Sequence, residues 1–159
     1  MIFCGMLALC RMILWAVVDL FRRSVRELAA RDYTAAQLSA WAPEVPDLNA
    51  WAARLETGGV FVCARDMQII GFCRIDHTGV VDLLYVDPSC AREGVATALM
   101  NEVFAWARQH ALRRLFADVS ITALAFFERS GFRVRRLQAV ERRGIPLANF
   151  RMERDFGDA

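Results

Sequence analysis

The spacing of hydrophobic and polar residues predicts most of the elements of this chain. Apolar residues recur every three or four positions over about 8–30, with arginines on the other face, and similar spacing returns over 94–110. Both stretches are therefore predicted to be amphipathic helices. Three mostly apolar, β-branched runs at 60–65, 69–76 and 80–86 are separated by short polar turns, which predicts an antiparallel meander.

Capping residues mark two shorter helices between the first helix and the meander. Thr34 is a suitable N-cap for a helix that ends before Pro43. Asp47 can cap another helix that runs to Gly58.

The last third of the chain continues with a strand at 115–119 and a helix ending at Gly131. Two long strands, 132–141 and 145–153, then pair across an Arg-Arg-Gly turn.

The order of these elements predicts a single domain over residues 1–159. It is a mixed α/β fold with a mostly antiparallel central sheet flanked by helices. Because a helix separates strand 80–86 from strand 115–119, these two strands are expected to run parallel.

The loop between strand 80–86 and helix 94–110 carries the clearest chemical signal. Gly94 lets the backbone turn tightly, and the small Ala96 and Thr97 keep the first helical turn open. The first N–H groups of a helix have no partner within the helix and lie at the positive end of its dipole, so this turn can receive a phosphate. The alternative is an ordinary strand-to-helix connection in which Gly94 only caps the helix.

Two segments resemble signatures of the GNAT superfamily of acyl-CoA-dependent N-acetyltransferases. Segment 84–96, LYVDPSCAREGVA, resembles the pyrophosphate-binding signature, usually Gln/Arg-x-x-Gly-x-Gly/Ala after a strand ending in hydrophobic-Val-x-Pro. Ala91 stands at the usual first position, and Arg92 beside it could meet a phosphate oxygen instead. Segment 123–132, ALAFFERSGF, is similar to the family's Ala-x-x-Phe-Tyr-Glu-x-x-Gly-Phe helix. The resemblance covers about residues 20–155, and the closest likeness is to uncharacterised bacterial members.

The resemblance implies acetyl-CoA as co-substrate and a fold of the GNAT kind. In that fold the strands corresponding to 80–86 and 115–119 form a splayed parallel pair that admits the pantetheine arm, while the loop holds the pyrophosphate. The residues that the resemblance assigns to the cofactor are Leu84, Tyr85, Val86, Ala91, Arg92, Glu93, Gly94, Val95, Ala96, Thr97, Ser120, Ala123, Phe126 and Phe127.

Attack of an amine on a thioester requires a base for the ammonium proton and a donor for the oxyanion. Asp82 is the candidate base, with Asp118 on the facing strand as the second choice. A free carboxyl has a pKa of about 4, so the site must desolvate it or relay the proton through water. The alternative for each is a carboxylate paired with an arginine such as Arg74 or Arg114. The backbone N–H of Tyr85, or of the residue after it, is the candidate oxyanion donor.

The chain differs from the family at the residue that commonly acts as the general acid. Members commonly carry a tyrosine where this chain has Phe127, which cannot donate a proton. Only Tyr33 and Tyr85 offer a phenol, and a water-assisted step is the alternative because a coenzyme A thiolate is a tolerable leaving group.

The acceptor is predicted to be a small primary amine or a peptide amino group. The resemblance places the two short helices along the acceptor site, so Tyr33 and Trp41 are the candidate substrate-binding residues. Trp51, on an apolar helix face, is interpreted as a core anchor.

Composition excludes some other functions. A formal charge of +2 gives no case for a nucleic-acid partner. With His77 and His110 as the only histidines, the sequence predicts no metal site and no histidine-based triad. The five cysteines lack Cys-x-x-Cys spacing and are interpreted as reduced thiols of a cytoplasmic protein.

The first residues are unusual for the family. Residues 2–21 are strongly apolar, so 1–19 form an atypical N-terminal segment, without the features of a signal peptide. A membrane span is not favoured, because Arg11 and Asp19 interrupt the segment and a central arginine costs roughly 2.5–3.5 kcal/mol on insertion. Membrane anchoring and burial in a homodimer remain the alternatives for this apolar surface.

The sequence thus predicts an enzyme, a cytoplasmic N-acetyltransferase that uses acetyl-CoA in a direct ternary complex. The rival function is a non-catalytic acyl-CoA-binding regulatory domain, motivated by Ala91 and Phe127.

Overall fold

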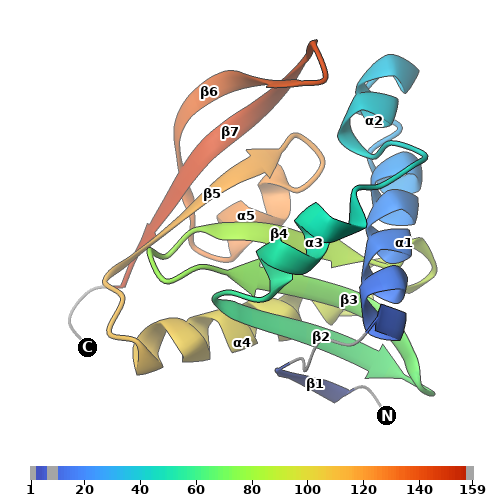
Figure 1. Ribbon diagram of the computed structural model, residues 1–159. Helices are drawn as coiled ribbons and strands as arrows, with labels where there is room; N and C mark the ends of the chain where they lie inside the picture. The colour runs from blue at the N-terminus through green and yellow to red at the C-terminus, as the bar shows by residue number, and fades with distance from the viewer. Residues whose placement is uncertain (1–2, 7–10, 157–159) are drawn as a thin grey trace.

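The computed structural model describes residues 3–6 and 11–156 of the chain (Figure 1). Its elements, in chain order, are β1 (Phe3–Met6), α1 (Arg11–Leu28), α2 (Ala35–Trp41), α3 (Leu48–Leu55), β2 (Gly59–Arg65), β3 (Gln68–Ile75), β4 (Val81–Val86), the 3-10 turn η1 (Pro88–Cys90), α4 (Val95–Gln109), β5 (Arg114–Ser120), α5 (Leu124–Arg129), β6 (Arg133–Arg142) and β7 (Ile145–Asp155). The predicted elements are all present in this order, and the mixed α/β fold is confirmed. Residues 8–10 of the first predicted helix lie outside the described part.

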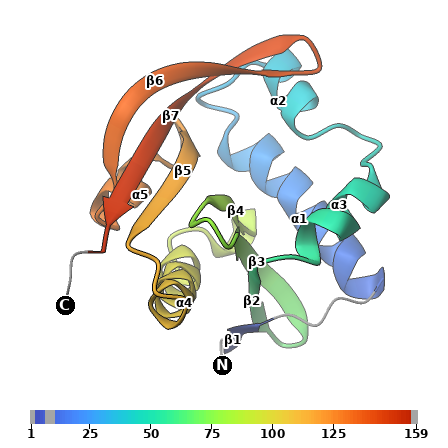
Figure 2. The same cartoon turned by 60° about the vertical axis from the view of Figure 1, so that its left-hand side comes forward.

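The strands form two antiparallel sheets, ordered β1-β2-β3-β4 and β5-β7-β6. The expected parallel pair of β4 and β5 is not formed, because the two strands are edges of separate sheets. Within the described residues, strand pairing between the two sheets is limited to one isolated parallel bridge, Val80 with Phe116. The outer edge of β4 beyond Val80 therefore has no partner strand within the described residues. Figure 2 shows the second sheet standing apart from β4.

Helices cover both faces of the first sheet (Figure 2). On one face α1 buries Val17, Leu20 and Val25 against β3 and β4, as its apolar spacing predicts. On the other face α4 buries Leu99 and Val103 against β2, β3 and β4.

Leu99→Ala should test this packing, because the Leu99 side chain is 0 % exposed at the centre of α4. We expect a loss of about 2–5 kcal/mol in the free energy of unfolding, measured by urea denaturation. Met12→Ala, at a position that is 83 % exposed on α1, should change it by about 0.5 kcal/mol or less. Equal effects of the two substitutions would contradict the assignment of Leu99 to the core.

The two short helices begin where their caps predict. The Thr34 hydroxyl accepts a hydrogen bond from the Gln37 N–H, and the Gln37 side chain accepts one from the Thr34 N–H, which is a reciprocal capping box. The Asp47 carboxylate accepts from the Ala50 N–H at the start of α3. These caps fix the course of the chain along one wall of the cavity described below.

The apolar N-terminal segment contributes an edge strand and the first turns of α1. β1 pairs antiparallel with β2. Across 3–6 and 11–156, no helix is both long and apolar enough to cross a bilayer. Met12 and Trp15 are exposed on α1.

The cysteines only partly follow the expectation of reduced thiols. Cys73 and Cys90 are free and buried, but Cys63 is disulfide-bonded, so the expectation is wrong for it. Cys63 lies opposite Cys4 in the β1–β2 register, and the spacing of cysteines along the sequence does not reveal this strand pairing. The side chains of Cys4 and Cys10 lie outside the described part.

Candidate active site

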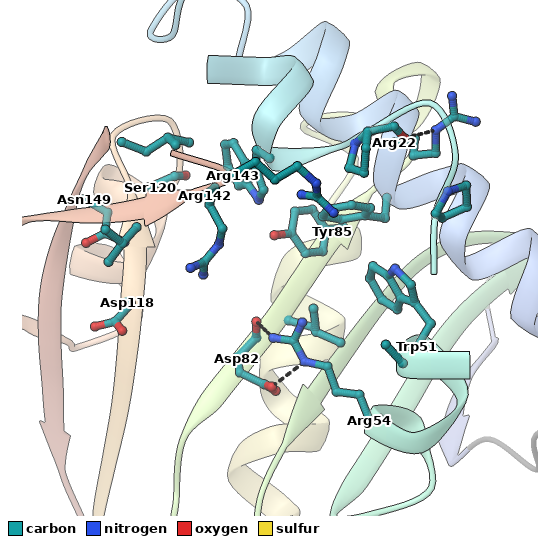
Figure 3. A pocket seen from close by; sticks show the side chains of 18 of the residues that line it. Arg22, Trp51, Arg54, Asp82, Tyr85, Asp118, Ser120, Arg142, Arg143 and Asn149 are labelled. Carbon is teal, nitrogen blue, oxygen red and sulfur yellow. Dashed lines mark hydrogen bonds and ion pairs between the residues drawn. The ribbon is translucent and has the colours of Figure 1, made fainter. Parts of the chain in front are cut away.

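A cavity of about 380 Å³ opens between the two sheets, under α1, α2 and α3. β4 and β5 contribute Asp82, Tyr85, Asp118 and Ser120 to its lining, and the β6–β7 hairpin closes the far side (Figure 3). The volume suits a small molecule. Both candidate bases, both candidate substrate-binding residues and two candidate cofactor residues, Tyr85 and Ser120, thus line one space.

A β-bulge aims Asp82 and Tyr85 into the same cavity. Arg74 lies opposite Leu83 and the next residue of β3 lies opposite Val81, so Asp82 is the extra residue of β4. In a regular strand Asp82 and Tyr85, which are three residues apart, would point to opposite faces. The extra residue of the bulge interrupts this alternation, so both side chains line the cavity. Leu84 and Val86 consequently pack toward α4, on the side away from the cavity.

Asp82 is held by two arginines. Its Oδ2 atom accepts hydrogen bonds from Arg54 Nε and Arg74 Nη1, each at 2.8 Å, and Arg54 also reaches the Asp82 carbonyl oxygen (Figure 3). Arg74 is itself fixed by the carbonyl and hydroxyl oxygens of Thr57. The pairing with Arg74 that the sequence left as an alternative is present, and Arg54 was not foreseen. The Oδ1 atom is buried without a hydrogen-bond partner among the described residues.

Asp118 has a more exposed setting on β5. Its Oδ1 atom accepts from Arg151 at 3.1 Å and from the side-chain amide of Gln138 at 2.9 Å. Arg114, the partner suggested by the sequence, pairs with Asp155 instead. Asp118 is therefore tied to the second sheet.

Tyr85 presents its phenol to the cavity from an aromatic cluster. Its ring contacts Phe21 and Phe72, and Figure 3 shows its hydroxyl pointing into the open space. Burial raises the pKa of Tyr85 to about 12, with Trp41 and the charges of Arg54 and Arg142 opposing that rise. The phenol is therefore protonated at neutral pH.

Tyr33 and Trp41 line the cavity as expected, but the Tyr33 hydroxyl is committed to structure. It donates to the Ala148 carbonyl at 2.7 Å and accepts from the Ile121 N–H at 3.0 Å, which ties the start of α2 to the second sheet. Trp51 packs on Phe21 and is partly buried against the core, as its interpretation as a core anchor requires, but it also lines the cavity.

The phosphate loop has an open turn at Gly94. Its φ is 84°, no side chain caps the start of α4, and a Cβ at Gly94 would meet nothing within 4 Å. The first intrahelical bond runs from the Ala98 N–H to the Gly94 carbonyl, so the N–H groups of the first three residues of α4, Val95, Ala96 and Thr97, have no partner in the helix. This turn can accept an anion on backbone donors.

Other residues of the loop lie around this turn. Arg92 is exposed with a φ of 66°, Ala91 is partly buried, and Glu93 forms an ion pair with Arg65. The Arg92 guanidinium has no partner in the described part of the chain and can meet an anion, whereas the Glu93 carboxylate already has a cationic partner.

A second cleft of about 390 Å³ adjoins this loop between α4 and α5. Thr97 and Phe126 line it, together with Arg129. Phe127 does not line it, because its ring is buried in the core against Phe132. Phe127 therefore lines neither cavity, and the absence of a tyrosine hydroxyl at this position changes the lining of neither.

Ser120 and Ala123 lie at the start of α5. The Ser120 hydroxyl accepts from the Ala123 N–H at 3.1 Å while its side chain borders the first cavity. Within 3–6 and 11–156, no group of three or more histidine, cysteine or acidic side chains could hold a metal ion.

Sequence reasoning missed several residues of the cavity. Arg54 and Asn149 line it, as do Arg142 and Arg143 of the β6–β7 turn (Figure 3). The Arg-Arg-Gly run was visible in the sequence but was interpreted only as a turn. Nothing in the local sequence around Arg54 or Asn149 indicates that these side chains meet β4 and β5.

Comparison with known proteins identifies the family. Residues 29–154 match the acetyltransferase (GNAT) domain. The chain is 39% identical over 134 residues to the uncharacterized N-acetyltransferase YafP of Escherichia coli (strain K12), covering 84% of this chain and 83% of that protein.

Solved structures share the whole fold. A GCN5-related N-acetyltransferase from Rhodopseudomonas palustris superposes with a TM-score of 0.90 at 25% identity, covering 98% of this chain and 95% of that one. The PaiA N-acetyltransferase from Thermoplasma acidophilum, solved in complex with coenzyme A, has a TM-score of 0.78 at 16% identity over 98% of this chain and 99% of that one.

The family match spans most of the chain and is joined by a relative of high coverage, and the fold is that of an acetyltransferase. The chain belongs to the GNAT family and is an N-acetyltransferase.

Proposed function

We propose that this enzyme transfers the acetyl group of acetyl-CoA to a primary amine of a small molecule by direct attack in a ternary complex. The observation that carries the proposal is the open turn at Gly94, which lies in the chain between the edge strand β4, whose Asp82 and Tyr85 line the first cavity, and α4, whose Thr97 lines the second cleft. A peptide amino group is the second acceptor class.

The chain offers suitable partners for each part of the co-substrate. Backbone N–H groups of residues 92–97 would hold the pyrophosphate, with Arg92 supplying a side-chain charge. The unpaired outer edge of β4 around Leu84 and Val86 would hydrogen-bond the pantetheine amides. Ala91, Glu93, Ser120, Ala123, Phe126 and Phe127 complete the expected surroundings, Phe127 as buried support and the others as neighbours.

Asp82 is the proposed base. The reacting amine must lose a proton before its nitrogen forms a bond to the thioester carbonyl carbon. Asp82 Oδ2 is occupied by two guanidinium groups and Oδ1 is buried, so proton transfer would run through a water molecule in the cavity. The backbone N–H of Tyr85 would stabilise the oxyanion, and the carbon–sulfur bond then breaks to release the thiolate.

The Tyr85 phenol is the group we assign to protonating that thiolate. Tyr33 cannot serve because its hydroxyl already donates to the Ala148 carbonyl, whereas the Tyr85 hydroxyl faces the cavity (Figure 3).

Tyr85→Phe should lower kcat by about 10- to 100-fold and leave acetyl-CoA affinity within about twofold. Because burial raises the pKa of Tyr85 to about 12, ionisation of the phenol should cause no fall in the parent's rate up to about pH 10. Cys90→Ser, a change at a buried thiol beside the loop, is the matched control and should retain turnover. An unchanged kcat in Tyr85→Phe would remove Tyr85 from the mechanism.

The proposal as a whole is tested by thiol detection of coenzyme A release from acetyl-CoA with a panel of primary amines. Amine-dependent release, with the acetylated amine identified by mass spectrometry, is the expected result. Tight acetyl-CoA binding without release for any amine would favour a regulatory acyl-CoA-binding role and contradict the proposal.

A further inference from the structure

The acceptor cavity carries a positive charge that no carboxylate of the described residues neutralises. Arg22, Arg142 and Arg143 line it, and in the described residues each forms hydrogen bonds only with a backbone carbonyl, of Pro43, Glu141 and Ala40 respectively. None of the three has an acidic side chain within ion-pair distance among those residues.

The acidic residues of the same cavity are already engaged. Asp47 caps α3, Asp82 holds two arginines, and Asp118 accepts from Arg151. The cavity therefore has spare donors for an anion, concentrated at the β6–β7 turn.

Arg142 is the best placed of these donors. Figure 3 shows its guanidinium directed into the cavity between Asn149 and Tyr85. Its only hydrogen bond there is a 3.3 Å contact of Nη1 with the neighbouring Glu141 carbonyl, which leaves the other N–H groups open. A guanidinium matches the two oxygens of a carboxylate in a bidentate arrangement.

Asn149 supplies a second polar group without a partner. Its Oδ1 atom is buried and makes no hydrogen bond with the described residues, and its side chain lines the cavity directly opposite Ser120 in the β5–β7 register. A carboxylate cannot donate to this oxygen, but the Nδ2 donors of the same amide also have no partner among the described residues, and a carboxylate seated beside Arg142 can accept from them.

The opposite wall is aromatic. It is lined by Phe21, Trp41, Trp51 and Tyr85. Such rings favour an apolar group or an ammonium above their faces.

We infer that the acceptor is a primary amine that also carries a carboxylate, of the α-amino acid kind, and that Arg142 binds this carboxylate. The amine then lies toward Asp82 and β4, and the side chain of the acceptor lies on the aromatic wall. This inference rests on the proposed function, and it goes beyond it by naming the class of acceptor and a residue that selects it.

The test compares amino acids with their carboxamides, which keep the amine and the side chain but lack the negative charge. The pairs are phenylalanine, tryptophan, leucine and methionine with their amides, and phenethylamine and spermidine are included as amines without an anion. Coenzyme A release gives kcat/KM for each compound. Calorimetry of the protein saturated with coenzyme A gives binding of each compound independently of turnover.

The parent should prefer at least one acid over its amide by about 30-fold in kcat/KM. Arg142→Gln should reduce this preference to about threefold or less by slowing the acid alone, with acetyl-CoA affinity unchanged. Arg136→Gln is the matched control, because Arg136 is exposed on the same strand, bonds to Gln138 and does not line the cavity. It should retain the full preference.

The possible failures can be told apart. Equal rates or equal binding of acids and amides by the parent overturn the inference and leave the proposed function standing. Loss of the preference in Arg143→Gln but not in Arg142→Gln overturns the assignment of Arg142. No binding and no coenzyme A release with any compound overturns the inference together with the proposed function.

Discussion

Gly94→Asp should weaken acetyl-CoA binding by about 100-fold or more while the protein stays folded. The new carboxylate would occupy the turn that is proposed to hold the pyrophosphate, adding negative charge where N–H donors now point. A Cβ at Gly94 meets nothing within 4 Å, but the φ of 84° is a left-handed conformation that costs a non-glycine residue about 1–2 kcal/mol, so we expect a modest loss of stability in a protein that remains folded. Calorimetric titration with acetyl-CoA measures the loss, and thermal unfolding checks the fold.

Gly144→Asp is the matched control for this substitution. Gly144 also has a positive φ, of 76°, and open space around a Cβ, but it lies in the β6–β7 turn far from the start of α4 in the sequence. It should bind acetyl-CoA like the parent. Equal affinity in the parent and in Gly94→Asp would mean that the turn only joins a strand to a helix, and the cofactor site would have to lie elsewhere.

Asp82→Asn should lower kcat by about 100-fold or more and leave acetyl-CoA affinity within about twofold. Asparagine keeps the shape of the side chain and can still accept from Arg54 or Arg74, but it cannot take up a proton at neutral pH. Steady-state kinetics with acetyl-CoA and a reactive amine measures the loss. An unchanged kcat in Asp82→Asn would remove Asp82 from the role of base.

Asp118→Asn serves as the control for the base. Its carboxylate is more exposed and is tied to Arg151, so we expect less than about a threefold change in kcat. If Asp118→Asn abolished turnover and Asp82→Asn did not, the second choice of base would be the right one.

Local signals in the sequence were sufficient to predict most elements. Thr34 and Asp47 mark helix starts because their side chains bond to N–H groups three residues later, and the apolar spacing of α1 and α4 reflects contacts with a single sheet face. The turn at Gly94 could be found in the same way. Glycine readily adopts a positive φ, and here it stands directly before a segment with helical apolar spacing.

Features that depend on contacts between distant segments were either not predicted or predicted wrongly. Asp82 faces the cavity because of a bulge whose register is set by pairing with β3, and Arg54 reaches it from α3. The expected β4–β5 pair is absent because the two strands belong to separate sheets, whose facing edges meet in the described residues at one bridge, Val80 with Phe116. These outcomes are decided by which strands meet in space, and hydrophobic spacing along one segment carries no information about that.

The most direct test of the account is an initial-rate study in which acetyl-CoA and a reactive amine are both varied. Direct attack in a ternary complex predicts double-reciprocal lines that intersect, with Cys90→Ser giving the same pattern. Parallel lines, which indicate an acetylated enzyme intermediate, or no coenzyme A release above the uncatalysed rate, would contradict it.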